Sequence, residues 1–347
     1  MGFVRKALIM VLCAIMPLGN AFADHPVEKA APPLIDRLDT ASLTPGRHHF
    51  YFRAGARGTG VPVLVPVIVM KGEKPGKQLL LTAAVHGDEL NGIRVIHRLL
   101  EEIQPVALSG TIVAVPGVNQ PGMEAHSRYF GPRGGDPNRA FPGNQKRGEA
   151  EAVYVRHLWQ DLFLPGTDFA VDLHTQTTGT AYPLFVFADF RNNTARKMAY
   201  ALLPEMIKND KGEKGTLETS LLAKGVPAVT YEIGAPKRFQ DQLIEKAVMG
   251  LENMMVTSGL LDGTPLKPKA SPVVGTHYSN VTTEEGGLAV VHVSLRDRVE
   301  KGQLVATIYD PFGTPIRSYH TPHAGWVLAV ATDPVRDAGQ MLVRILQ

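Results

Sequence analysis

Two short polar motifs contain the residue types that metal-assisted hydrolysis needs. The motif HGDE at residues 86–89 places His86 and Glu89 three residues apart, and DLH at residues 172–174 adds His174. Two imidazoles and one carboxylate leave a coordination position open, which is the arrangement of catalytic rather than structural zinc sites. Taken alone, the first motif also fits an exposed His and Glu at a helix start, so the prediction depends on the combination.

Further motifs add a carboxylate and two cations. The motif YEIG at residues 231–234 contains Glu232, and a carboxylate beside an activated water serves first as general base and then as general acid. A helix-capping or ion-paired role is the alternative for this residue. Arg128 and the motif DPNR at residues 136–139 supply guanidinium groups, which bind carboxylates and stabilise a developing oxyanion. A single arginine is more often a solvated surface charge.

The elements around these motifs alternate between strand and helix patterns. This alternation predicts an α/β domain with a mostly parallel sheet, and three motifs lie where predicted strands meet their following turns. The two cations lie in the Gly- and Pro-rich segment 116–148, a length typical of functional or mobile loops. Strands are predicted at Gln78–Val85, Thr111–Val115, Asp168–Leu173, Leu184–Ala188 and Ala228–Ile233, and helices at Asn91–Gln104, Glu149–Phe163, Asn192–Ile207 and Arg238–Ser258.

The first 23 residues have the three-part pattern of a cleaved export signal. Arg5 and Lys6 precede the apolar run Ala7–Met16, and small residues at Ala21 and Ala23 fit a signal peptidase site. A membrane anchor or a buried N-terminal helix is the alternative. We expect export to the periplasm, no stable membrane insertion after cleavage, and a mature chain without cysteine, because the single cysteine lies in the apolar run.

Composition bounds the class of protein. The 347 residues suffice for one large or two medium domains, and 44% hydrophobic with 20% charged residues is ordinary for a soluble globular chain. The formal charge is +3, and no run of five Lys or Arg occurs, so a nucleic-acid partner is not expected. A β-rich lead-in at residues 41–70 opens a predicted catalytic domain at residues 24–262, followed by a linker at residues 263–275.

Residues 276–347 show short β segments with turn signals and predict a small C-terminal all-β domain. Residues 295–304 and 321–327 resemble a biotinyl/lipoyl-type barrel-sandwich, in which a modified lysine sits on an exposed hairpin. The matching turn at residues 310–313 contains no lysine, so no attached cofactor is expected. We expect this domain to shape the active-site mouth or to form a contact in a homo-oligomer; a purely stabilising role is the alternative.

The ordered set HGDE, DPNR, DLH and YE, within roughly residues 60–260, resembles the succinylglutamate desuccinylase/aspartoacylase family of the zinc-carboxypeptidase superfamily. Gly134 and Gly135 lengthen the arginine segment, as in the bacterial predicted-deacylase branch. The resemblance implies a mixed sheet flanked by helices, a fold shared with zinc carboxypeptidases. It also implies one Zn²⁺ per chain.

The same resemblance assigns roles to individual residues. It implies that His86, Glu89 and His174 hold the zinc, and that Asp136 forms a hydrogen bond with one of the two histidines. Glu232 matches the general base, and Arg128 matches the arginine that polarises the scissile carbonyl. Asn138 and Arg139 match the pair that binds a free carboxylate of the substrate. His126 and Asp172 are expected to line or buttress the site rather than to bind the metal.

Together these features predict an exported zinc-dependent hydrolase that cleaves the amide bond of an N-acyl amino acid or a similar carboxylate-bearing amide. Two alternatives stay open. One is a zinc carboxypeptidase or amidase acting on short peptides, including those of the cell wall. The other is a catalytically inactive periplasmic binding protein on the same fold, although the retained ligands and base argue against it.

Overall fold

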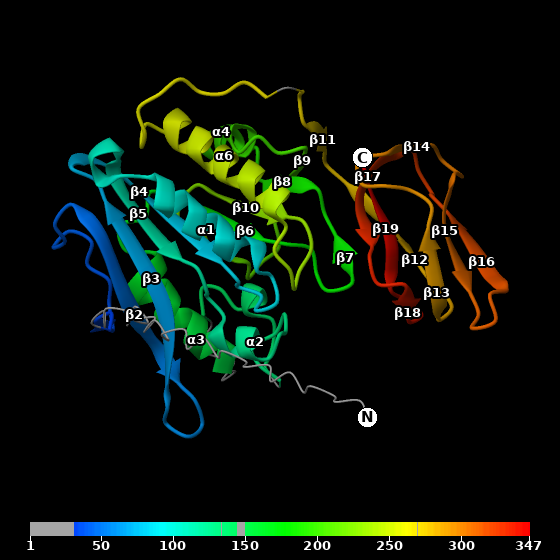
Figure 1. Ribbon diagram of the computed structural model, residues 1–347, viewed down its shortest axis with the longest axis horizontal. Helices are drawn as coiled ribbons and strands as arrows, with labels where there is room; N and C mark the ends of the chain where they lie inside the picture. Colours follow the sequence, from blue (N-terminus) through cyan, green and yellow to red (C-terminus); the bar gives the residue numbers. More distant parts are fainter. Residues whose placement is uncertain (1–30, 133, 144–149, 269) are drawn as a thin grey trace, which may run out of the picture. The chain divides into compact units, whose positions relative to one another are not determined.

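The computed structural model describes residues 31–347 except residues 133, 144–149 and 269, so the predicted signal at residues 1–23 lies outside the described residues. One ten-stranded mixed sheet dominates (Figure 1), in the order β1-β2-β3-β5-β4-β6-β10-β8-β9-β11. Its strands are β1 (Leu34–Ile35), β2 (Gly46–Ala56), β3 (Pro62–Lys71), β4 (Lys74–Ala83), β5 (Ser109–Val115), β6 (Phe169–His174), β8 (Leu184–Ala188), β9 (Met206–Asn209), β10 (Ala228–Ile233) and β11 (Val273–Gly275).

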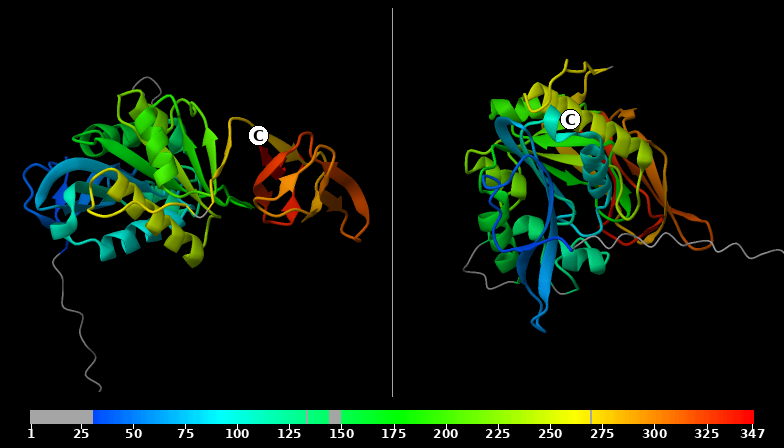
Figure 2. Two further views of the ribbon diagram at one scale, coloured as in Figure 1. Left: turned by 90° about the horizontal axis from the view of Figure 1, so that it is seen from above. Right: turned by 60° about the vertical axis from the view of Figure 1, so that its left-hand side comes forward.

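Helices cover both faces of this sheet (Figure 2). Alternate residues of the central strands face opposite cores, so Leu79 and Leu81 pack with one set of helices and Leu80 with the other. The first face is covered by α1 (Asn91–Glu102), α4 (Asn193–Ala201) and α6 (Asp241–Thr257), and the second by α3 (Ala150–Leu158), a π-helical turn at Trp159–Phe163 and α5 (Leu217–Leu222). Burial on both faces explains why β5, β6, β10 and residues 79–83 of β4 consist mainly of apolar residues.

The predicted fold class is confirmed, with one correction. The sheet is mixed and mostly parallel, as predicted, since only the pairs β2–β3, β3–β5 and β10–β8 are antiparallel. The predicted helix Asn192–Ile207 is wrong at its end, since α4 stops at Ala201 and Met206 begins β9. Leu203 has a left-handed backbone with φ of 51°, and Pro204 has no N–H to continue the helix.

The C-terminal residues form two antiparallel sheets around a core of their own. One sheet contains β12 (Tyr278–Thr282), β19 (Met341–Leu346), β17 (Gly325–Ala331) and β14 (Arg298–Val299), and β7 (Thr180–Ala181) pairs with β17. The other contains β16 (Pro315–His320), β15 (Leu304–Tyr309), β13 (Gly287–Val291) and β18 (Val335–Arg336). The β15–β16 hairpin turn has no lysine, and β11 lies inside the predicted linker.

In the described part of the chain, no helix combines the length and the apolar character that crossing a membrane requires.

Candidate active site

The turn between β4 and α1 places His86 and Glu89 at the carboxyl end of a central strand. Gly87 allows this turn to pack against the short helix α2 (Gln120–Glu124), because a Cβ at residue 87 would lie 2.0 Å from the carbonyl carbon of Gly122. Such a contact is far shorter than any that real side chains show, so the second position of the HGDE motif requires glycine. His174 ends the neighbouring strand β6 and completes the group.

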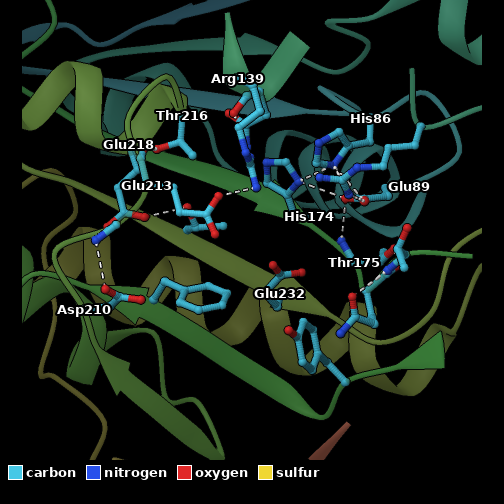
Figure 3. Close-up of a pocket in the computed structure, with 18 of the residues that line it drawn as sticks. His86, Glu89, Arg139, His174, Thr175, Asp210, Glu213, Thr216, Glu218 and Glu232 are labelled. Carbon is cyan, nitrogen blue, oxygen red and sulfur yellow. Dashed lines mark hydrogen bonds and ion pairs between the residues drawn. The ribbon is translucent and has the colours of Figure 1, made fainter. Parts of the chain in front are cut away.

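The side chains of His86, Glu89 and His174 converge in a buried group, called the metal group below because its atoms could hold a metal ion. His86 Nδ1 lies 2.8 Å from Glu89 Oε1, and His174 Nδ1 lies 2.8 Å from Glu89 Oε2. The candidate ligand atoms lie within 4.8 Å of one another, and each of the three residues is at most 3% exposed. Figure 3 shows the group at one end of the pocket. The carboxylate of Glu89 has a pKa below its usual range, because the two histidines outweigh the opposing effect of burial.

The geometry of this group fits a tetrahedral divalent metal. The two Nδ1 atoms are 3.2 Å apart, and a tetrahedral zinc with ordinary Zn–N bonds holds two nitrogens about 3.3 Å apart. Two lone-pair nitrogens at this separation need a cation or proton between them. The outer nitrogens are also occupied: His86 Nε2 lies 3.2 Å from Asp136 and His174 Nε2 lies 2.8 Å from Asp172, as in many zinc–histidine–carboxylate arrangements.

Arg128 lies against the same group. Its Nε and Nη2 donate to Asp136 Oδ2 at 3.1 and 2.9 Å, and its Nη1 lies 3.5 Å from Glu89 Oε1. Burial lowers the pKa of the Arg128 guanidinium, but the negative charges of Glu89 and Asp136 outweigh this effect and raise the pKa. Arg128 is therefore a fixed cation beside the metal group, with Asp136 linking it to His86.

Glu232 is a buried carboxyl without a hydrogen-bond partner at Oε2, among the described residues. Strand β10 pairs in parallel with β6, and the register aligns Glu232 with His174. Burial raises the pKa of Glu232 to about 8, with Glu89 and Asp172 adding to the effect against His174 and Arg128. In Figure 3 its carboxyl group lies in the same cavity as the metal group, so it is placed to exchange a proton with a ligand there.

The predicted carboxylate-binding pair lies in the same cavity, which has a volume of about 400 Å³. Asn138 and Arg139 both line it, but each already has a partner. Asn138 Oδ1 accepts a hydrogen bond of 2.9 Å from Leu217 N, and Arg139 Nη2 lies 2.5 Å from Glu213. Binding a substrate carboxylate at Arg139 would therefore compete with Glu213. His126 does not line the cavity.

Several pocket residues were not anticipated from the sequence. Their origins are scattered: one follows the DLH motif, two come from segments around β7 and α5, and two come from C-terminal strands. The polar run TQTTGT at residues 175–180, directly after His174, is the only signal that pointed to any of them. The missed residues include Gln176, Tyr182, Glu218, Tyr278 and Arg344.

The fold and the site together define a class of protein: mixed α/β hydrolases with a buried His–Glu–His group at the carboxyl edge of the sheet. Comparison with known proteins assigns the family. Residues 75–258 match the succinylglutamate desuccinylase/aspartoacylase catalytic domain, which is about half of the chain. The chain belongs to this family, as its motifs predicted, and it is a hydrolase of the deacylase type.

Individual relatives agree with this assignment. An N-alpha-acetyl-L-2,4-diaminobutyric acid deacetylase from Halomonas elongata is 27% identical over 261 residues, covering 72% of this chain and 75% of that protein. The product-bound ectoine utilization protein EutE (DoeB) from Ruegeria pomeroyi superimposes with a TM-score of 0.77 at 25% identity, covering 87% and 96% of the two chains. A succinylglutamate desuccinylase/aspartoacylase from Rhodobacter sphaeroides, 22% identical, shares the fold with a TM-score of 0.76 over 88% and 96%.

Proposed function

We propose that this chain is a zinc-dependent hydrolase that removes the acyl group from an N-acyl amino acid. The observation that carries the proposal is the buried convergence of His86, Glu89 and His174 next to Glu232, a carboxyl group with a free oxygen. The deacetylase from Halomonas elongata is named for an N-acetylated amino acid, which supports the same class of substrate here. The cavity volume of about 400 Å³ suits a small amide of this kind.

His86, Glu89 and His174 would hold the metal. A zinc ion held there would supply Lewis-acid chemistry, lowering the pKa of a bound water toward about 7 and polarising the scissile carbonyl. Asp136 and Asp172 orient the imidazoles so that both Nδ1 atoms face the same point. Either carboxylate is therefore important for the affinity of the site without being a ligand.

Glu232 and Arg128 perform the proton transfer and charge stabilisation in this proposal. Glu232 accepts a proton from the attacking water and then donates it to the nitrogen of the leaving amine. Burial raises the pKa of Glu232 above the usual range of a carboxylic acid, which helps the group to retain a proton until the leaving amine accepts it. Arg128, held by two hydrogen bonds to Asp136, donates to the oxygen on which negative charge develops.

The test is metal content together with hydrolysis, for the wild type and E232Q. The panel contains N-acetyl and N-succinyl amino acids and short peptides, which separates a deacylase from a peptidase. We expect about one zinc per chain in both proteins, and a loss of about 10²–10⁴-fold in kcat for E232Q. Glu300 is exposed on the C-terminal domain, so E300Q is the matched control and should retain wild-type activity.

Three outcomes would contradict the proposal. If the chain binds no zinc, the assignment of His86, Glu89 and His174 as ligands is wrong. If E232Q keeps the wild-type kcat, Glu232 is not the general base. A zinc-loaded wild type that hydrolyses nothing on the panel favours a binding protein instead.

We also propose export to the periplasm, on the pattern of residues 1–23. Sequencing the N-terminus of protein from a periplasmic fraction tests this, and an N-terminus at Asp24 is expected.

A further inference from the structure

The segment that follows His174 connects the metal group to the C-terminal sheets. At one end, the backbone N–H of Thr175 donates to Glu89 Oε2 at 3.0 Å (Figure 3). At the other end, residues 180–181 form β7, which pairs in antiparallel fashion with β17 of the C-terminal sheets. Residues 175–181, called the linking loop below, therefore contact both a candidate metal ligand and the C-terminal sheets.

A hydrogen bond fixes the middle of the linking loop to the HGDE turn. Thr178 Oγ1 donates to Asp88 Oδ2 at 2.6 Å, and Asp88 is only 3% exposed. Its other oxygen, Oδ1, has no partner among the described residues, so this buried carboxylate depends on the Thr178 hydroxyl. Because Asp88 directly precedes Glu89, the same hydrogen bond limits the movement of the neighbouring metal-group residue.

Arg336 on β18 holds the linking loop from the C-terminal side. This side chain is 6% exposed, and its Nη2 donates to the carbonyl oxygen of Gly179, which also accepts from Thr332 N at 2.8 Å. Burial lowers the pKa of the guanidinium although the charge of Asp333 opposes the shift, and Nε has no acceptor in the described part of the chain. An apolar side chain would fill this position at a lower cost in desolvation, so the hydrogen bond to the loop is what requires an arginine.

The two parts of the chain approach closely at Gly179. Its φ is 81°, a left-handed conformation that favours glycine, and a Cβ there would lie 3.0 Å from Asp333 Oδ2 and 3.1 Å from Arg336 Nη1. The linking loop therefore packs against Arg336 with no space for a side chain between them.

We propose that Arg336 is a positioning residue for the metal group. It fixes the linking loop at Gly179, and the loop then fixes the carboxylate of Glu89 through its first amide and through the hydrogen bond of Thr178. The C-terminal sheets thereby help to orient Glu89. The inference rests on the proposed function in one respect, namely that the metal group holds a divalent cation.

The experiment compares the full-length wild type with R336M and T178V. R336M keeps the length of the side chain but removes its donors, and T178V removes an exposed hydroxyl without touching the C-terminal sheets. Competition with a chelator measures zinc affinity, and we expect each variant to bind zinc about 10–100-fold more weakly, as found for residues that orient metal ligands. At saturating Co²⁺, the visible absorption bands, which depend on the ligand geometry, should shift in both variants. R336K, which keeps a donor, should recover part of the loss.

Three variants serve as controls. R317Q removes an exposed arginine from β16 of the same sheet, and T282V removes an exposed hydroxyl from β12. I308A weakens the inner C-terminal core without contacting the linking loop. All three should keep the zinc affinity and the Co²⁺ bands of the wild type. If I308A weakens zinc binding as much as R336M does, or if R336M and T178V leave affinity and bands unchanged, Arg336 is a purely structural residue and the proposal is wrong.

Hydrogen exchange separates this proposal from the proposed function. In the metal-free protein, the amides of residues 175–181 should exchange about tenfold faster in R336M than in the wild type, because the loop loses a hydrogen bond from a charged donor. A wild type that binds no metal contradicts the proposed function, and the exchange rates then show whether Arg336 holds the loop. Equal exchange in R336M and the wild type overturns the positioning role even if the wild type binds zinc.

Discussion

At the scale of single residues, Glu218 is a buried acid of the pocket, and no cation of the described residues forms an ion pair with it. Its Oε2 accepts a hydrogen bond of 2.8 Å from Thr230, and its Oε1 has no partner among the described residues. Burial raises its pKa to about 8, and the nearby carboxylates Asp172, Asp210 and Asp189 add to the effect. Folding therefore favours the protonated form of this carboxyl, and ionising it in the folded state costs stability.

The pH dependence of stability follows from the direction of this shift. A folded-state pKa above the unfolded value contributes stability that is complete below about pH 4.5 and is lost as pH rises to about 8. E218Q keeps the shape of the side chain but cannot ionise. We expect the stability of E218Q relative to wild type to rise between pH 5 and pH 8.5 by at least about 1 kcal/mol, since one pKa unit corresponds to about 1.4 kcal/mol.

Urea unfolding of both proteins at the two pH values measures this difference. E300Q, which removes an exposed carboxyl, serves as the control and should show the same stability relative to wild type at both pH values. A relative stability of E218Q that is flat with pH, or that falls as pH rises, would mean that Glu218 is ionised in the folded protein.

At the scale of elements, the packing of α1 on the sheet determines the distance between Glu89 and His174. Gly92 in the first turn of α1 lies against β4 and β6: a Cβ there would be 2.7 Å from Leu173 Cβ and 3.1 Å from Ala83 Cβ. An alanine in a helix is intrinsically better than glycine by about 0.5–1 kcal/mol. Any net loss of unfolding free energy in G92A therefore reports the displacement of helix α1 from the sheet.

We expect G92A to lose about 1–3 kcal/mol of unfolding free energy, the range found for overpacked cores, and to bind zinc more weakly. Chemical denaturation gives the first quantity, and competition with a chelator gives the second. E101A changes an exposed residue of the same helix and should alter neither. If G92A were as stable as the wild type with unchanged zinc affinity, the contact of α1 with the sheet would not control the site.

The strands of the large sheet differ in how well the sequence predicts them. Strands β6 and β10 and the buried second half of β4 were predictable because burial on both faces makes them mainly apolar. Their carboxyl ends placed His86, His174 and Glu232 near one another. Strand β9 was missed because Met206 and Ile207 continue the apolar stripe of α4, although Pro204 was a signal against a helix there.

The pocket wall was less predictable than the metal group. His86 and Glu89 come from one turn, so their proximity follows from local spacing. Tyr182 and Arg344 are 162 positions apart in the chain, and only the pairing of β7 with β17 and of β17 with β19 brings them into contact. Such contacts depend on the tertiary fold, so single motifs do not reveal them.

At the scale of the whole described molecule, the C-terminal sheets share a core with the large sheet. Tyr182, Phe185 and Met206 of the large α/β part pack with Leu328, Ala329 and Leu346 of the C-terminal part, and all six are at most 3% exposed. The inner core of the C-terminal sheets is a separate cluster that includes Ile308 and Val343. Because the shared cluster couples the two parts, we expect the chain from residue 32 onward to unfold in one calorimetric transition.

Truncating a residue of the shared cluster should weaken this coupling. Leu328 is fully buried there, so L328A should lose about 2–5 kcal/mol and should split the transition into two. I308A removes a similar apolar volume inside the C-terminal core, away from the shared cluster, so it should lower the transition temperature while leaving one transition. Differential scanning calorimetry distinguishes these results. If the wild type already unfolds in two transitions, the C-terminal sheets are an independent unit, and Arg344 then reaches the pocket from a domain that is free to move relative to the metal group.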